Sequence, residues 1–197
     1  MELAGVSKHS PTRITSERHE AAVLAPVIQR EDTPHLLFTK RADHLGEHPG
    51  QMSFPGGGRE PSDETLYETA VREANEEIGL DQSEVGLVGQ LDDIRTVTQY
   101  SVTPFVVEVP DRGYRPDERE VAEIAVLPVT GFIDTANYEC EHRDHPHYGE
   151  ILIHFFHVNG YTVWGATARI LVQLLELTTD WRAPERIDRT VDKDPDL

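Results

Sequence analysis

Residues 72–80 of the 197-residue chain read REANEEIGL, and three glutamates, Glu73, Glu76 and Glu77, stand within five positions of one another. Like charges at i, i+3 and i, i+4 spacing weaken a helix by about 0.2–0.5 kcal/mol per pair. A divalent cation removes this repulsion, since Mg2+ is typically bound by one or two carboxylates together with water and substrate phosphates. The cluster therefore raises the question of a metal site.

Helix signals surround these glutamates. Ser62 or Asp63 can serve as N-cap, and Gly79 stands where a C′ glycine belongs. On a helix over residues 63–78, Glu73 and Glu77 lie one turn apart at the edge of the apolar stripe, where their repulsion is poorly screened, and Glu76 lies just beyond. The stripe consists of Leu66, Ala70, Ala74 and Ile78. Oxygen ligands favour Mg2+ or Mn2+ over zinc, whereas a solvated acidic face is the alternative interpretation.

The spacing of the residues around the glutamates decides between these interpretations. Residues 58–80 match the pattern G-x5-E-x7-R-E-U-x-E-E-x-G-U, in which U is apolar, at every position. Seven fixed residues coincide by chance at about one in 10^7 to 10^8 per starting point. In this pattern the chain resembles the Nudix hydrolases. The resemblance implies an α/β protein, a sandwich of the α/β/α type with a mixed β-sheet between helices, that hydrolyses a nucleoside diphosphate linked to another moiety.

The same resemblance implies a metal site for Mg2+ or Mn2+. Glu73 and Glu77 would be metal ligands, and Glu76 would be a further ligand or would contact a bound water. A glycine carbonyl just before the helix would complete the site. Gly57 is the candidate, although the run Gly56-Gly57-Gly58 leaves this register ambiguous by one residue.

The resemblance also implies catalytic roles. Arg72 would hold the glutamate side chains in position through charge-assisted hydrogen bonds. Metal ions bridging the diphosphate oxygens neutralise charge and lower the pKa of a bound water. The attacking water needs a base, for which Glu73 is one candidate. Glu120, in RPDEREVAEI, is the second candidate and is otherwise a surface acid.

The segment before the glycines resembles the additional motif of the coenzyme A pyrophosphatases, L-L-T-x-R-[SA]-x3-R-x3-G-x3-F-P-G-G. Residues 36–57 read LLFTKRADHLGEHPGQMSFPGG and depart from the motif at Phe38 and at Gly46, which stands where the second arginine is expected. Two later segments, residues 97–107 and 161–171, also resemble this subfamily. The implied products are 4′-phosphopantetheine and adenosine 3′,5′-bisphosphate.

Substrate contacts are expected in this same segment. Arg41 follows a predicted strand and precedes the glycine-rich loop, so it is the natural phosphate contact, with a surface ion pair as the alternative. Gln51 and the glycines Gly56 and Gly57 are expected to line the pocket. Phe54 either lines that pocket or belongs to the core.

Two other functions remain open from the sequence. Gly46 weakens the match to coenzyme A, so another substrate, such as ADP-ribose or a dinucleotide cofactor, is the alternative within enzymes. A noncatalytic module that binds a nucleotide or a partner is the alternative outside enzymes. The complete set of motif glutamates argues against the second alternative.

Composition limits the partners and the compartment. The net charge is −18, and only three of the 18 basic residues are lysines, a composition that resembles proteins adapted to high salt, with an ordinary acidic cytosolic protein as the alternative. Nucleic-acid binding needs a basic footprint, which is missing. Cys140 is the only cysteine, and no apolar run suits a signal peptide or a membrane span. We expect a cytoplasmic enzyme with a small-molecule substrate and no membrane partner, and a homodimer remains open.

The pattern along the chain predicts one domain. Residues 1–18 are expected to form a flexible arm, residues 19–180 the Nudix hydrolase domain, and residues 181–197 a charged tail. Strands are expected at 21–28, 35–41, 85–94, 103–109 and 119–129, with a hairpin over 150–164 that turns at Asn159-Gly160. Residues 165–177 are expected to form a second helix. The histidines of 142–147 are interpreted as solvated loop residues.

Overall fold

The computed structural model describes residues 1–45, 50–96, 98–145, 149–185 and 187–191. The helices are α1 (Ala4–Ser7), α2 (Leu66–Ile78), α3 (Val129–Ile133) and α4 (Gly165–Thr178), with 3-10 turns η1 (Gln82–Glu84) and η2 (Thr135–Asn137). The strands are β1 (His19–Arg30), β2 (Thr33–Arg41), β3 (Met52–Ser53), β4 (Gly56–Gly58), β5 (Gly86–Gln90), β6 (Ile94–Arg95), β7 (Tyr100–Glu108), β8 (Val121–Pro128), β9 (Tyr138–His145), β10 (Gly149–Val158), β11 (Tyr161–Trp164) and β12 (Arg189–Val191).

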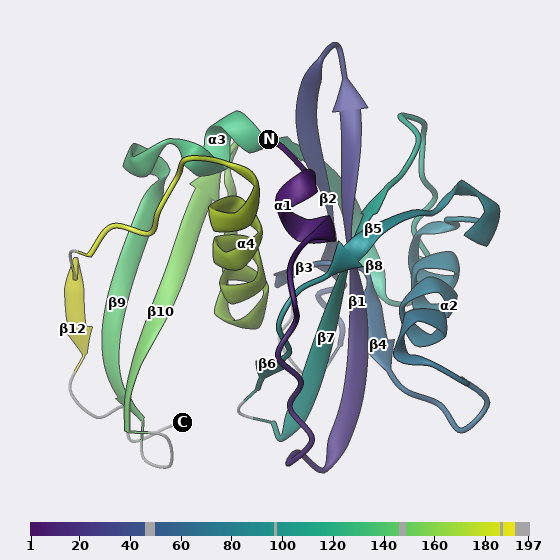
Figure 1. Cartoon of the computed structure of the whole chain (residues 1–197), viewed down its shortest axis with the longest axis horizontal. Coiled ribbons are helices and arrows are strands. Elements are labelled where there is room, and N and C mark those ends of the chain that lie inside the picture. The colour runs from purple at the N-terminus through teal and green to yellow at the C-terminus, as the bar shows by residue number, and fades with distance from the viewer. Residues whose placement is uncertain (46–49, 97, 146–148, 186, 192–197) are drawn as a thin grey trace.

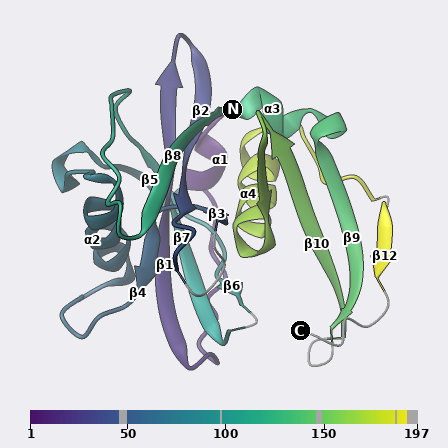
Figure 2. The same ribbon diagram turned by 180° about the vertical axis from the view of Figure 1, so that it is seen from behind.

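The central sheet is mixed. Its main path runs β3-β2-β1-β7-β5, while β4 pairs with β1, β6 with β7 and β8 with β2. β1 runs parallel to β7 over nine registered pairs and antiparallel to β2. Helix α2 lies against one face of this sheet, and α1 and α4 lie on the other, as Figures 1 and 2 show from opposite sides. This arrangement agrees with the α/β/α sandwich expected from the sequence.

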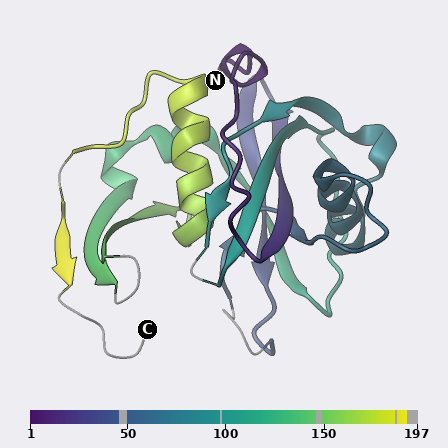
Figure 3. The ribbon, with the colours of Figure 1, turned by 60° about the horizontal axis from the view of Figure 1, so that its bottom comes forward.

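A second sheet lies beyond α4 and was not expected. Its strand order is β11-β10-β9-β12, with β12 parallel to β9 (Figure 3). β9 covers residues 138–145, so the interpretation as loop residues is wrong for His142 and His145. The Nε2 atom of His142 lies 3.6 Å from a carboxylate oxygen of Glu150. His147 lies outside the described residues.

Two cores form on the two faces of the central sheet, because alternate residues of each strand point to opposite sides. On β2, Leu37 packs under α2, whereas Leu36 and Phe38 belong to the core beneath α4. On β7, Val107 belongs to the core under α2, and Val106 belongs to the core beneath α4. The α2 side therefore has a separate and smaller core.

β1 and β2 separate toward one end of the sheet, and the glycine segment fills the space between them. Residues 27–30 of β1 pair with β2, whereas residues 21–23 pair with β4. Gly56 has φ +152, and a Cβ atom there would lie 2.3 Å from the Ala22 carbonyl oxygen. Only glycine fits this close approach, which brings the loop under α2.

The terminal segments make specific contacts. The backbone N–H groups of Thr12 and Ile14 donate to the carboxylates of Asp92 and Asp93 at 2.7 and 2.8 Å. At the other end, Trp181 is buried, and β12 adds to the second sheet. No helix in the part of the chain that the structure describes is long and apolar enough to cross a membrane.

Candidate active site

Helix α2 begins three residues later than the sequence indicates. Thr65, rather than Ser62 or Asp63, is the N-cap, and it forms a capping box with Glu68 in which each side chain accepts from the other residue's backbone N–H. Gly79 ends the helix with φ +65, as expected for a C′ glycine. The helix is thus capped at both ends, which holds its glutamates in a fixed register against the sheet.

Glu73 and Glu77 project from α2 toward the glycine segment of β4. The Gly56 N–H donates to Glu77 Oε2 at 3.0 Å. A Cβ atom at Gly57 would lie 2.5 Å from the Glu73 carboxyl carbon. The missing side chains therefore allow the backbone to approach both carboxylates, as a site that includes a backbone carbonyl would require.

Burial makes these two carboxylates hard to ionise together. The pKa of Glu77 is raised to about 8, mainly by removal from water and in smaller part by the charges of Glu73 and Glu120. The Gly56 N–H and the charge of Arg41 act in the opposite direction. Burial likewise raises the pKa of Glu73, against the hydrogen bond from Arg72. A bound cation would favour the ionised form of both groups.

This shift predicts how stability depends on pH in the presence of a chelator. The folded protein holds a proton on Glu77 up to about pH 8, whereas the unfolded chain releases it near pH 4.5. The free energy of unfolding should therefore fall as pH rises through this window. Replacing Glu77 with glutamine should make Tm less dependent on pH. Melting curves of the wild type, Glu77→Gln and the exposed-site control Glu76→Gln measure this, and equal slopes in all three would contradict the burial of Glu77.

Arg72 links the helix to the loop that precedes it. Its guanidinium donates to Glu73 Oε1 at 2.9 Å and to the Gly58 carbonyl at 3.1 Å. It also makes a fork with both oxygens of Asp63, at 3.1 and 3.0 Å. The sequence assigned Asp63 only to helix capping. Its pairing with Arg72 was missed because nine residues separate the two and no helical spacing relates them.

Glu76 and Glu120 lie at the outer part of the site. The Glu76 side chain is 59% exposed, and its carboxylate is 3.5 Å from Arg72. Glu120 is exposed, and its charge raises the pKa of both Glu73 and Glu77. Its carbonyl accepts from the Ala42 N–H at 2.9 Å, which attaches it to the end of β2. The structure therefore brings the charge of Glu120 close to the carboxylates of Glu73 and Glu77.

The segment before the glycines approaches the glutamates through Arg41. The Arg41 N–H donates to the Gln51 carbonyl at 2.9 Å, and the charge of Arg41 lowers the pKa of Glu77. Gln51 lies on the side of α4, since its Nε2 would be 3.6 Å from a Cβ atom at Gly165. Gly46, the departure from the upstream motif, lies outside the described residues.

Phe54 belongs to the core rather than to a pocket. Its ring is 2% exposed and stacks on Phe38 at a centroid distance of 4.7 Å. A substrate would have to displace this contact to reach the ring. Of the two alternatives that the sequence left open, the structure therefore supports the core position.

The donor set fits a hard divalent cation, although its side chains do not converge. Among the described residues, no three histidine, cysteine, aspartate or glutamate side chains converge to form a metal site. Glu73 instead pairs with Arg72, and Glu77 accepts from Gly56. The two partly buried carboxylates beside a glycine backbone provide oxygen atoms only, which are the ligands that Mg2+ and Mn2+ prefer. Rotations of these side chains would have to bring them together.

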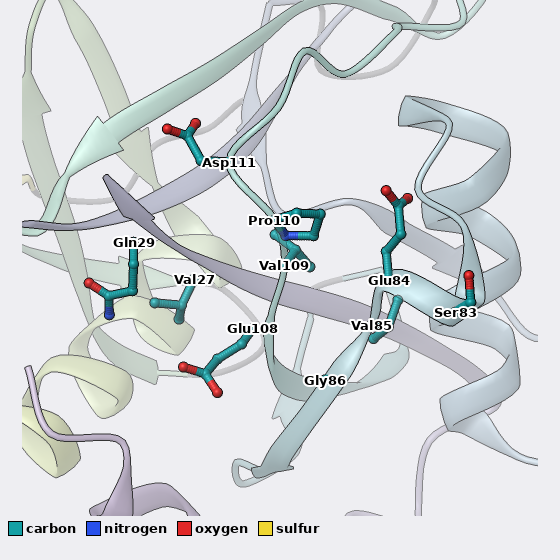
Figure 4. Close-up of a pocket in the computed structure, with 10 residues that line it drawn as sticks. All are labelled: Val27, Gln29, Ser83, Glu84, Val85, Gly86, Glu108, Val109, Pro110 and Asp111. Carbon is teal, nitrogen blue, oxygen red and sulfur yellow. The ribbon is translucent and has the colours of Figure 1, made fainter. Parts of the chain in front are cut away.

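Two surface pockets lie away from the paired glutamates. Figure 4 shows one of about 490 Å3, between the ends of β1 and β7 and the start of β5, with Glu84, Glu108 and Asp111 at its wall. Two of these acids, Glu84 and Asp111, pair with Arg112 and Arg30, and the residues of this pocket are not those of the glutamate cluster. A second pocket of about 360 Å3 lies along α2 and includes Asp63 and Arg72 but neither Glu73 nor Glu77. We therefore base the site on the carboxylates rather than on either pocket.

Comparison with known proteins identifies the family. The family model of the NUDIX domain matches residues 18–147, more than half of the chain. This chain belongs to the Nudix family. NudL of Enterobacter sp. (strain 638), named as an uncharacterized Nudix hydrolase, is 37% identical over 167 residues, which cover 83% of this chain and 84% of that protein. NudL of Yersinia enterocolitica is 36% identical over 170 residues, with 84% and 85% covered.

Solved structures agree on the fold. A MutT/nudix family protein from Enterococcus faecalis superposes with a TM-score of 0.55 at 11% identity, covering 86% of this chain and 64% of that one. The Nudix hydrolase RenU of M. smegmatis gives a TM-score of 0.50 at 23% identity, with 59% and 74% covered. At these identities the similarity concerns the fold alone.

The family membership defines the class of reaction. The protein is a Nudix pyrophosphohydrolase that acts on a nucleoside diphosphate derivative. Nudix hydrolases generally use divalent metal ions, and the oxygen-only donor set described above is compatible with that use. The fold class and the enzyme class expected from the sequence are thereby confirmed.

Proposed function

We propose that this Nudix hydrolase cleaves the diphosphate of coenzyme A or its derivatives, releasing 4′-phosphopantetheine and adenosine 3′,5′-bisphosphate. The observation that carries the proposal is the position of Arg41, whose charge acts on Glu77. Because of this proximity, the segment that resembles the coenzyme A motif opens onto the same site as the glutamates. A substrate diphosphate held between them would contact both.

In this proposal, Glu73 and Glu77 hold Mg2+ or Mn2+, with Glu76 as a further ligand or water contact and a carbonyl of the glycine segment, assigned to Gly57, completing the site. When bound, the metal neutralises the diphosphate and lowers the pKa of a water. Arg72 keeps the Glu73 carboxylate in place through its hydrogen bond of 2.9 Å. The water's proton passes to Glu73 or to Glu120. The exposure of Glu120 favours it, because the Glu73 carboxylate already accepts a hydrogen bond from Arg72.

Substrate binding is assigned to the segment before the helix. Arg41 contacts a phosphate, Gln51 lines the approach from the side of α4, and the backbone of Gly56 and Gly57 faces the diphosphate. The 3.6 Å approach of Gln51 to the Gly165 position supports a binding surface that continues toward α4. Phe54 has no part in this proposal because its ring is buried.

Hydrolysis of another nucleoside diphosphate derivative, such as ADP-ribose or a dinucleotide cofactor, is the second candidate. The glycine at position 46, where the coenzyme A motif has an arginine, favours it. A panel that contains coenzyme A, acetyl-coenzyme A, ADP-ribose and NADH, each with Mg2+ or Mn2+, separates the two. The highest kcat/KM on a coenzyme A compound supports the proposal, and the highest value on ADP-ribose or NADH contradicts it. Hydrolysis of none of them would support a noncatalytic nucleotide-binding module.

Arg41 provides a prediction that concerns the substrate. Replacing Arg41 with alanine should lower kcat/KM by about 10–100-fold, because a charged contact to a phosphate is worth about 1.5–3 kcal/mol. Tm should change little. Arg41→Lys should recover part of the loss, since it keeps the charge but not the bidentate geometry. A change in Tm with unchanged kinetics would show that Arg41 is structural.

A further inference from the structure

Asp63 is a buried carboxylate that accepts hydrogen bonds both from the turn before the catalytic helix and from the helix itself. Its side chain is 5% exposed. Its oxygens accept from Arg72 Nε and Nη2, from Thr69 Oγ1 at 2.9 Å and from the Glu60 N–H at 2.9 Å. We propose that Asp63 is a positioning residue that fixes the Arg72 guanidinium and, through it, the carboxylate of Glu73 at the metal site. This inference rests on the function proposed above.

The fork determines where the rest of the guanidinium points. With Nε and Nη2 on Asp63, Nη1 is left facing Glu73 Oε1 at 2.9 Å. A guanidinium is planar, so two fixed donors also fix the direction of the third. The position of Glu73 therefore depends on an aspartate that does not itself contact the glutamate.

Other acids compete for the same arginine. Glu76 is 3.5 Å and Glu60 is 4.0 Å from Nη1, and both side chains are exposed. Without the fork, the guanidinium can turn toward either of them and pull away from Glu73. The bidentate geometry and low exposure of Asp63 make its pairing the stronger one, because exposed ion pairs contribute little.

Asp63 is itself held rigidly enough for this role. The Glu60 N–H fixes one oxygen within the turn that precedes α2, and Thr69 fixes the same oxygen from the first turn of the helix. Hydrogen bonds from Arg72 hold the pKa of Asp63 well below its usual range, so that it stays ionised. Arg72 also donates to the Gly58 carbonyl, which joins β4 to the same network. The turn, the helix and the glycine strand thus meet at one guanidinium.

The test measures metal binding separately from turnover. Asp63→Asn keeps the size of the side chain but cannot accept both bonds of the fork. We expect it to weaken Mn2+ affinity, measured by calorimetry without substrate, by about 10–100-fold and to lower kcat by a similar factor. KM should change less, because the substrate contacts at Arg41 are intact.

Asp93→Asn is the matched control, since Asp93 is 7% exposed and accepts hydrogen bonds from Thr103 and the Ile14 N–H, away from the glutamates. It should leave Mn2+ affinity unchanged. Thr69→Val removes one support of Asp63 without removing its charge, and it should give a smaller loss in the same direction. This variant keeps the test valid if Asp63→Asn does not fold.

A double-mutant cycle shows whether Asp63 acts through Arg72. In the Arg72→Lys background, where the fork is already absent, Asp63→Asn should have little further effect on Mn2+ affinity. Full additivity would overturn the proposal, as would wild-type affinity in folded Asp63→Asn. A wild-type protein that binds no Mn2+ would contradict the proposed metal site itself. Failure of the role of Asp63 can therefore be distinguished from failure of the proposed metal site.

Discussion

Glutamine at position 73 or 77 is expected to lower kcat by about 10^3-fold or more while the protein stays folded. Both carboxylates are partly buried beside the glycine segment, and both have a raised pKa because of that burial. Glutamine keeps the shape and removes the charge that would hold a cation. The apo Glu77→Gln protein should be slightly more stable than the wild type above pH 8, because a charge that is costly to bury is gone.

Steady-state kinetics with Mg2+ and Mn2+, together with melting curves, measure both effects. Glu108→Gln is a suitable control, because Glu108 is exposed at the far end of β7 beside the pocket of Figure 4. Its kcat should equal that of the wild type. Near-normal turnover in both Glu73→Gln and Glu77→Gln would remove the basis for the proposed metal site.

The second large effect concerns Gly57. Replacing it with alanine places a Cβ atom 2.5 Å from the carboxyl carbon of Glu73, a contact that forces the glutamate to move. A displacement of about 1 Å at a catalytic group can cost about 10^2-fold in rate, and we expect a loss of that order for Gly57→Ala. The loss should appear in kcat and in Mn2+ affinity, which calorimetry measures directly.

The neighbouring glycines provide internal controls. At Gly58 a Cβ atom meets nothing within 4 Å, so Gly58→Ala should keep most of the activity although Gly58 belongs to the family pattern. At Gly56 the clash is with backbone, so Gly56→Ala should lower Tm as well as activity. Equal activity of Gly57→Ala and Gly58→Ala would show that the Glu73 carboxylate does not need its position against the glycine strand.

The sequence predicted those parts of the fold that local patterns determine. The helix with its glutamates, the αL glycine at Gly79 and the Asn159-Gly160 hairpin all depend on neighbouring residues, and the structure confirms them. Strand β9 of the second sheet was missed because its charged residues and histidines resemble those of a solvated loop. Two of them, Glu141 and Arg143, pair with each other in the structure, which makes a charged strand compatible with partial burial.

The site was predictable where a motif fixes residue types and unpredictable where tertiary contacts decide. The glutamates and Arg72 follow from their spacing, but the partner of Arg72 does not. Asp63 was assigned to a cap because aspartate suits that position, whereas Thr65 competes for it and has its capping partner Glu68 three residues later. Phe54 stayed ambiguous since an aromatic residue beside glycines fits a pocket and a core equally well.

The two separate cores of the central sheet have an evolutionary consequence. The catalytic helix packs only on one core, and the second sheet packs on the other, with the backbones of β1, β2 and β7 as the partition between them. Substitutions that remodel the second sheet therefore leave the packing under the glutamates intact. In evolution, the two sides of this partition can therefore diverge at different rates, because a substitution in one core does not disturb the packing of the other.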